Sequence, residues 1–173
     1  MIYVLAVPQF DAAQSGRVES FRALHEPARA RLVPAHLTLA FSLSRTPATE
    51  VIEQCQKLAA DTPEFKVAFS RAETEFDKYE HTYKLLLTTS TGSALVKQLH
   101  RSLYDAFPLE EFDANLPYRP HMTVATHPKR KVIEALDISQ LGRFPFFGRV
   151  KSLNVVSVSR GRVLQIGQHP LAM

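Results

Sequence analysis

The 173-residue sequence has one cysteine, no tryptophan and no apolar run that approaches the ~20 residues needed to span a bilayer. The single cysteine, Cys55, excludes an internal disulfide and a metal site built from several cysteines, and it favours a cytoplasmic location. The sequence also lacks Gly-x-Ser-x-Gly, Gly-x-Gly-x-x-Gly and phosphate-binding P-loop motifs. We therefore expect no membrane partner, no cofactor and none of the enzyme classes that those motifs mark.

The composition is that of a folded globular domain. Apolar residues make up 45% of the chain and charged residues 22%. We expect one bilobal domain over residues 1–173 and a monomer. The net charge is +4 and the sequence pI about 9.3. This charge favours an anionic partner, such as RNA or a phosphorylated small molecule, or simply gives a mildly basic surface, because Lys and Arg are scattered along the chain.

Hydrophobic periodicity and turn residues predict a mixed α and β chain. Pro8 should end the first strand, and Thr46 should cap a helix that has Pro47 at its first position. Gly148 should supply a turn between two late strands. The predicted strands cover residues 2–7, 35–41, 65–69, 82–88, 121–126, 143–147, 150–158 and 162–167, and the predicted helices cover 11–24, 46–60, 93–107 and 130–136.

The order of these elements repeats. The series strand, helix, strand, strand begins at His36 and begins again 85 residues later at His121. A repeat of this size predicts two similar lobes that face each other, because a solenoid would need more copies of a shorter unit.

Each repeat opens with a His-x-Thr strand, preceded by a proline. Alternate side chains of a strand share a face, so His36, Thr38 and Ala40 should point one way, and His121, Thr123 and Ala125 likewise. With 7 histidines and 11 threonines, chance would give roughly 0.4 His-x-Thr triplets. Two copies with apolar residues at the second and fourth positions are much rarer, which favours a shared site over two unrelated buried histidines.

Such a pair of strands suits phosphoester chemistry. One imidazole can take a proton from the attacking oxygen while the other gives a proton to the leaving oxygen, since the unperturbed imidazole pKa is near 6.5. The two threonine hydroxyls can donate hydrogen bonds to phosphate oxygens. This chemistry requires no metal. We expect His36 as the acid and His121 as the base, although the symmetry makes these roles exchangeable.

The segments Pro34–Leu39 and Arg119–Val124 resemble the paired signatures of the two-histidine (2H) phosphoesterases, a superfamily that includes the 2′-5′ RNA ligases and cyclic nucleotide phosphodiesterases. The resemblance implies an α+β fold of two pseudo-symmetric lobes, each an antiparallel sheet with helices packed outside, and an active-site cleft between the sheets. It also implies that the substrates are RNA ends or small cyclic nucleotides. Many relatives carry Arg soon after the second motif, whereas this chain has Thr126 and His127 there.

Three further residues are candidates for substrate binding. Arg119 can contact phosphate or remain solvated, and Tyr118 can stack on a base or form part of the cleft wall. Lys84, in an apolar strand, faces either the cleft or water at a sheet edge. The remaining histidines have no spacing typical of metal ligands.

The leading hypothesis is a metal-independent phosphodiesterase that hydrolyses a 2′,3′-cyclic phosphate or a 2′-5′ phosphodiester, with RNA ligation as the reverse reaction. The competing hypotheses are a non-catalytic module that binds RNA or a nucleotide in the same cleft, and a structural protein without a site.

Overall fold

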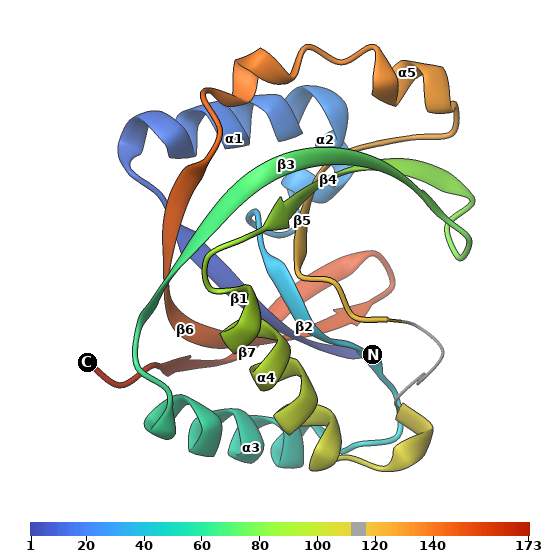
Figure 1. Ribbon diagram of the computed structural model, residues 1–173. Helices are drawn as coiled ribbons and strands as arrows, with labels where there is room; N and C mark the ends of the chain where they lie inside the picture. The colour runs from blue at the N-terminus through green and yellow to red at the C-terminus, as the bar shows by residue number, and fades with distance from the viewer. Residues whose placement is uncertain (112–116) are drawn as a thin grey trace.

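The computed structural model describes residues 1–111 and 117–173, which form an α+β fold (Figure 1). The predicted repeat is confirmed, because β2-α3-β3-β4 is followed by β5-α5-β6-β7. No helix in the described part of the chain is long and apolar enough to cross a membrane. The strands are β1 Ile2–Gln9, β2 Leu37–Leu43, β3 Phe65–Asp77, β4 Thr82–Thr89, β5 His121–His127, β6 Phe146–Ser159 and β7 Arg162–Pro170. The helices are α1 Ala12–His25, α2 Pro27–Ala30, α3 Ala48–Asp61, α4 Ser93–Asp105 and α5 Arg130–Glu134, with short 3-10 helices at Leu109–Glu111 and Ile138–Leu141.

The two lobes are halves of one antiparallel sheet. Its strand order is β2-β1-β6-β3-β4-β5, and β7 also pairs with β6. The long strands β3 and β6 join the halves, because the start of β3 pairs with the start of β6. The sheet curls until its two end strands, β2 and β5, contact each other. The curl therefore brings together the strands that carry the two His-x-Thr motifs.

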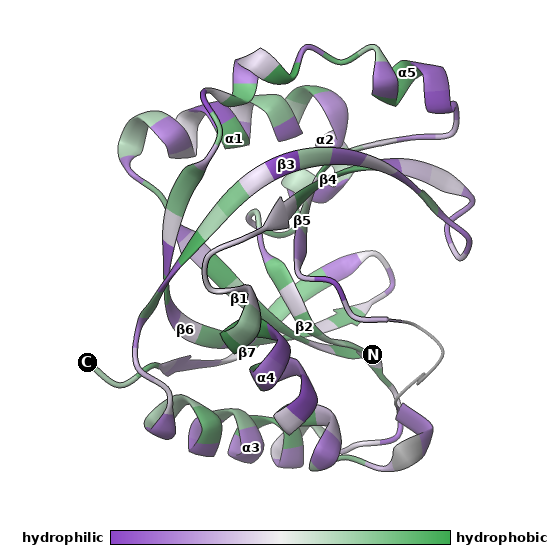
Figure 2. Cartoon of the chain, in the orientation of Figure 1, coloured by the Kyte–Doolittle hydropathy of each residue, from purple (hydrophilic) through white to green (hydrophobic). Residues whose placement is uncertain are grey.

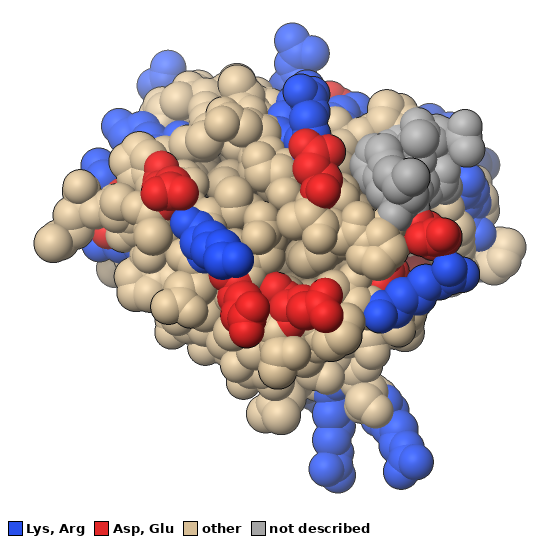
Figure 3. All heavy atoms as spheres, turned by 90° about the horizontal axis from the view of Figure 1, so that it is seen from below, with Lys and Arg blue, Asp and Glu red and all other residues tan. Residues whose placement is uncertain are grey.

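The helices cover the outer face of the curled sheet. α3 packs on β6 and β7, and α4 on β2, whereas α1 and α5 pack on the half that contains β5. In Figure 1, α1 and α5 lie above the sheet, and α3 and α4 lie below it. Both hydrophilic and hydrophobic residues occur along α3 and α4 (Figure 2), as expected for helices with one buried face. On the face seen from below (Figure 3), acidic and basic side chains are interspersed rather than gathered by sign.

Two of the predicted breaks in strands are wrong. β1 continues through Pro8 to Gln9. Its pairing with β2 ends at Ala6, so the missing N–H of proline costs no ladder bond on that side, and a bulge between Ala6 and Pro8 interrupts the pairing with β6 on the other. The two predicted strands at 143–147 and 150–158 are one strand, β6, with Gly148 inside it. A Cβ at Gly148 would lie 2.8 Å from Pro8 and from the Phe10 ring, so glycine permits close packing there rather than a turn.

The predicted cap of α3 is also wrong. The helix begins at Ala48 with Pro47 in the cap position and no side-chain cap bond. The Thr46 hydroxyl instead contacts the carboxylate of Glu111, which also accepts hydrogen bonds from the backbone amides of Ser44 and Thr46. Glu111 therefore satisfies the amides that precede the helix.

Candidate active site between the two motif strands

The two motif histidines have matching environments. Nδ1 of His36 lies 2.8 Å from the carbonyl oxygen of Pro34, and Nδ1 of His121 lies 2.8 Å from that of Arg119. A carbonyl oxygen can only accept a hydrogen bond, so Nδ1 carries the proton in both rings. Nε2 is then the atom that each imidazole offers to a ligand, as a base when neutral and as an acid when protonated.

Both imidazoles favour the neutral form in the unliganded protein. Burial lowers the pKa of His36 from 6.5 to about 4, the Pro34 hydrogen bond opposes this, and the charges of Arg22, Arg29 and His121 lower it further. His121 is among the groups that lower the pKa of His36, as expected for imidazoles on two strands that contact each other.

The environment of His121 differs in one respect. Burial lowers its pKa as well, and nearby Lys84 and Arg119 add to this effect. The Arg119 carbonyl and the carboxylate of Glu75 oppose the shift. His121 therefore has an anionic neighbour, whereas the side chains that act on His36 are all cationic.

A β-bulge follows the threonine of each motif. On β2, Thr38 pairs with Leu5 of β1, and Ala40 pairs with Val4, the adjacent residue of β1. Leu39 is therefore the extra residue. On β5, Thr123 pairs with Leu86, and Ala125 pairs with Leu85. Because each bulge inserts one residue, Ala40 and Ala125 turn into the core, where neither is exposed. The prediction that these alanines share the face of the histidines is therefore wrong.

The strands beside β5 extend the face that carries His121 and Thr123. Thr88 lies opposite His121, and Leu86 opposite Thr123. Directly opposite residues of an antiparallel pair point to the same side of the sheet. On β3, Arg71 pairs with Thr88 and Glu73 with Leu86. The sequence analysis missed these residues, although the alternating charges of β3 are a usable signal for a polar sheet face.

The three predicted binding residues, Lys84, Tyr118 and Arg119, each have a side-chain or backbone partner within the protein. Arg119 forms ion pairs with Glu73, at 2.6 Å, and with Glu75, and its side chain is 47% exposed. Lys84 pairs with Asp77 at 2.5 Å and is 13% exposed. Its strand, β4, has partners on both sides, so the predicted edge position is wrong.

Tyr118 lies against the other motif strand. Its hydroxyl donates to the carbonyl oxygen of Thr38 at 2.8 Å, and its ring stacks on His100 with the ring centroids 3.7 Å apart. His100 in turn contacts the Leu39 carbonyl at the bulge. One face of the Tyr118 ring is thus occupied by His100, and its hydroxyl is engaged by β2.

Metal-ligating side chains do not gather in this site. Within residues 1–111 and 117–173, no three His, Cys, Asp or Glu side chains lie so that they could hold a metal ion. Cys55 lies on the buried face of α3, in the hydrophobic core, and burial raises the pKa of its thiol to about 12.

Comparisons with known proteins agree with this geometry. A family model described as the 2′-5′ RNA ligase superfamily matches residues 9–162. Crystal structures of E. coli LigT are similar in fold: the complex with ATP has 23% identity and a TM-score of 0.59, with 99% of this chain and 97% of that chain covered. Kluyveromyces marxianus Usb1 has 14% identity and a TM-score of 0.67, with 98% and 97% covered.

A third solved structure, TT0787 of Thermus thermophilus, has 16% identity and a TM-score of 0.61, with 98% and 97% covered. No curated protein matches the sequence. The family match spans most of the chain and includes both His-x-Thr strands. The chain therefore belongs to the 2′-5′ RNA ligase superfamily, the two-histidine phosphoesterases.

Proposed function

We propose that this protein is a metal-independent phosphodiesterase that hydrolyses a 2′,3′-cyclic phosphate or a 2′-5′ phosphodiester of RNA or a nucleotide. The supporting observation is the matched pair of imidazoles, each with Nδ1 bonded to a carbonyl and Nε2 left for the substrate. Crystal structures of E. coli LigT with ATP and with 3′-AMP show that a similar fold holds nucleotides. RNA ends or small cyclic nucleotides are the proposed substrates of a cytoplasmic monomer, and ligation would be the reverse reaction.

The charges around the two histidines suggest how the roles divide. Arg22 and Arg29 disfavour a proton on His36. Arg119 and Lys84 likewise disfavour a proton on His121, but the carboxylate of Glu75 favours one there, and His36 has no such anionic neighbour among the described groups that act on it. We therefore assign His36 as the base and His121 as the acid, the reverse of the assignment expected from the sequence. Nε2 of His36 takes a proton from the attacking water, whose oxygen bonds to phosphorus. The bond to the leaving oxygen breaks, and Nε2–H of His121 protonates that oxygen.

The first experiment measures hydrolysis of 2′,3′-cyclic mononucleotides in the presence of a chelator. Turnover that depends on His36 and His121 supports the phosphodiesterase. Nucleotide binding without turnover of any cyclic phosphate would instead favour a non-catalytic binding module in the same cleft.

A second experiment separates acid from base. An activated phosphodiester with a p-nitrophenolate leaving group needs little protonation of the departing oxygen. If His121 is the acid, His121→Ala should lose much less activity on this ester than on a cyclic phosphate, whereas His36→Ala should lose similar activity on both. The opposite pattern would restore the sequence-based assignment.

A further inference from the structure

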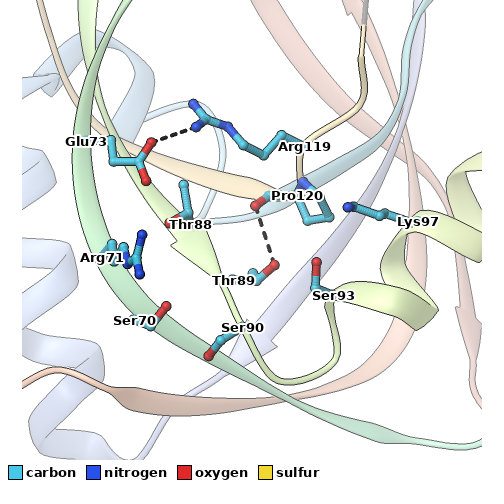
Figure 4. Close-up of a pocket in the computed structure, with 10 residues that line it drawn as sticks. All are labelled: Ser70, Arg71, Glu73, Thr88, Thr89, Ser90, Ser93, Lys97, Arg119 and Pro120. Carbon is cyan, nitrogen blue, oxygen red and sulfur yellow. Dashed lines mark hydrogen bonds and ion pairs between the residues drawn. The ribbon is translucent and has the colours of Figure 1, made fainter.

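A polar hollow lies beside His121. It has a volume of about 290 Å³ and is lined by the middle of β3, the end of β4, the first turns of α4 and the segment that precedes β5 (Figure 4). Two of its residues belong to the sheet face already described: Thr88 lies opposite His121, and Arg71 lies opposite Thr88. Because neighbouring strands are about 4.8 Å apart, Arg71 lies roughly 10 Å from His121. The hollow therefore lies next to the proposed active site, on the same face of the sheet.

Cationic and hydroxyl side chains dominate its lining. Arg71, Lys97 and Arg119 contribute three positive charges against one negative charge, that of Glu73. Among the described residues, no carboxylate lies within ion-pair distance of Arg71 or Lys97, so their charges are available to a ligand. Glu73, by contrast, already pairs with Arg119. Five hydroxyls complete the lining, from residues 70, 88, 89, 90 and 93.

This donor set matches a phosphate group. Cations and hydroxyls are the side chains that contact phosphate oxygens, and none of the described lining residues has an aromatic ring on which a base could stack. The volume is at the small end of ligand pockets, which are roughly 300–1,000 Å³. The hollow therefore has room for a phosphate and part of a sugar, rather than for a whole additional nucleotide.

We propose that this hollow, lined by Arg71, Lys97 and Thr88, is a subsite for a second phosphate of the substrate, one nucleotide away from the phosphate that reacts between the histidines. The inference rests on the proposed function and deepens it, because it makes the preferred substrate a nucleotide with at least two phosphates. The second phosphate comes either from a 5′-phosphate of the same nucleotide or from the linkage to the preceding nucleotide of an RNA chain.

The test compares three substrates: a nucleoside 2′,3′-cyclic phosphate with a 5′-hydroxyl, the same compound with a 5′-phosphate, and a dinucleotide that ends in the same cyclic phosphate. We expect the second phosphate to raise kcat/KM for the parent protein, and a higher salt concentration to reduce the gain. A gain only with the 5′-phosphate points to a small nucleotide, and a gain only with the dinucleotide points to RNA. Equal kcat/KM values for all three would overturn the subsite.

Lys97→Ala is the decisive variant, because Lys97 is exposed on α4 and its removal should not disturb folding. We expect it to reduce the gain from the second phosphate about five- to tenfold, since it removes one charged contact. Lys57→Ala, an exposed lysine on α3 outside the hollow, is the matched control and should keep the gain. Equal effects of the two substitutions would contradict the proposal.

A binding measurement keeps this test separate from the proposed reaction. Fluorescence anisotropy can compare a base-labelled nucleoside 3′-phosphate with and without a 5′-phosphate on the full chain and on Lys97→Ala. If no cyclic phosphate is hydrolysed but the 5′-phosphorylated probe binds more tightly through Lys97, the proposed reaction fails and the subsite stands. If both probes bind the two proteins equally, the subsite fails regardless of turnover.

Discussion

Tyr118 joins the two motif strands through one hydrogen bond, from its hydroxyl to the carbonyl oxygen of Thr38 at 2.8 Å. Tyr118 lies three residues before His121, and Thr38 belongs to the opposite motif. β2 is an end strand of the sheet, so side chains rather than a further strand occupy its outer edge. Tyr104 of α4 also contacts this edge, further along β2, where its hydroxyl accepts a hydrogen bond from the Phe41 amide. Tyr118 thus ties the segment before β5 to β2, and Tyr104 ties α4 to β2.

We predict that Tyr118→Phe lowers both stability and activity. The ring still stacks on His100, but the Thr38 carbonyl loses its partner, which should cost about 1 kcal/mol in the free energy of unfolding. Turnover should fall about tenfold because the two histidines are less well positioned. Urea unfolding and steady-state kinetics measure both effects. Tyr104→Phe is the control: it should lose similar stability and keep its turnover. Loss of stability alone in Tyr118→Phe would show that the bond has no positioning role.

Replacing His36 or His121 by alanine should remove most turnover of a cyclic phosphate, because proton transfer at each end of the displacement contributes about 10²–10⁴-fold. The double variant should lose less than the product of the single losses, since the residues act as a unit. His127→Ala is the control, because His127 is on the same strand but lies opposite Tyr83, beyond the bulge. If folded His36→Ala turned over every cyclic phosphate at the parent rate, the acid–base assignment would be wrong.

Thr38→Val and Thr123→Val should weaken transition-state stabilisation while the fold is kept. Both threonines are half-buried, and neither hydroxyl makes a hydrogen bond to any described residue, so both are available to a phosphate. The loss of one bond to a charged group costs roughly 1.5–3 kcal/mol, or about 10–100-fold in kcat/KM. Thr74→Val, on β3 opposite Leu85, removes a hydroxyl on the other side of the sheet and should leave kcat/KM unchanged. Unaltered kinetics in both motif variants would exclude the hydroxyls from catalysis.

The pH dependence of kcat/KM should be bell-shaped with an acidic optimum. His36 must be neutral and His121 protonated in the free protein. The rate should rise with pH through the His36 pKa of about 4, and it should fall as pH rises through the His121 pKa, which lies below 6.5. A bound anionic phosphate should raise both pKa values, so the optimum of kcat should lie at higher pH than that of kcat/KM. An optimum of kcat/KM well above pH 7 would contradict this ordering.

Turnover should survive EDTA, because the proposed mechanism uses only imidazole and hydroxyl groups. The measurement is the rate of hydrolysis of a cyclic phosphate before and after chelation. Activity lost on chelation and restored by added Mg²⁺ or Zn²⁺ would show that a metal takes part.

The family and the paired motifs could be predicted from the sequence because each motif is local in the chain. Each motif is a run of consecutive residues whose chemistry does not depend on the rest of the chain, and the element order after His36 recurs after His121. The central parts of strands and helices could be predicted as well, because burial of one face gives the apolar residues a regular spacing in the sequence. Two predicted strand breaks were wrong, because the roles of Pro8 and Gly148 depend on partners distant in sequence, β2 for Pro8 and Phe10 for Gly148.

The tertiary structure alone decided how the site is assembled. The bulges at Leu39 and Val124 depend on how β2 and β5 pair with their neighbours, so strict alternation placed Ala40 and Ala125 on the wrong face. The fold brings the charges of Arg22 on α1 and Arg29 on α2 to act on His36, and it pairs Arg119 with Glu73 and Glu75 of β3. The ion pairs of Arg119 join residues far apart in sequence. The amino-acid sequence by itself determined the family and the two His-x-Thr motifs. Only the folded sheet decided which charges, partners and bulges surround those motifs, because electrostatic and steric neighbours are set by distance in space.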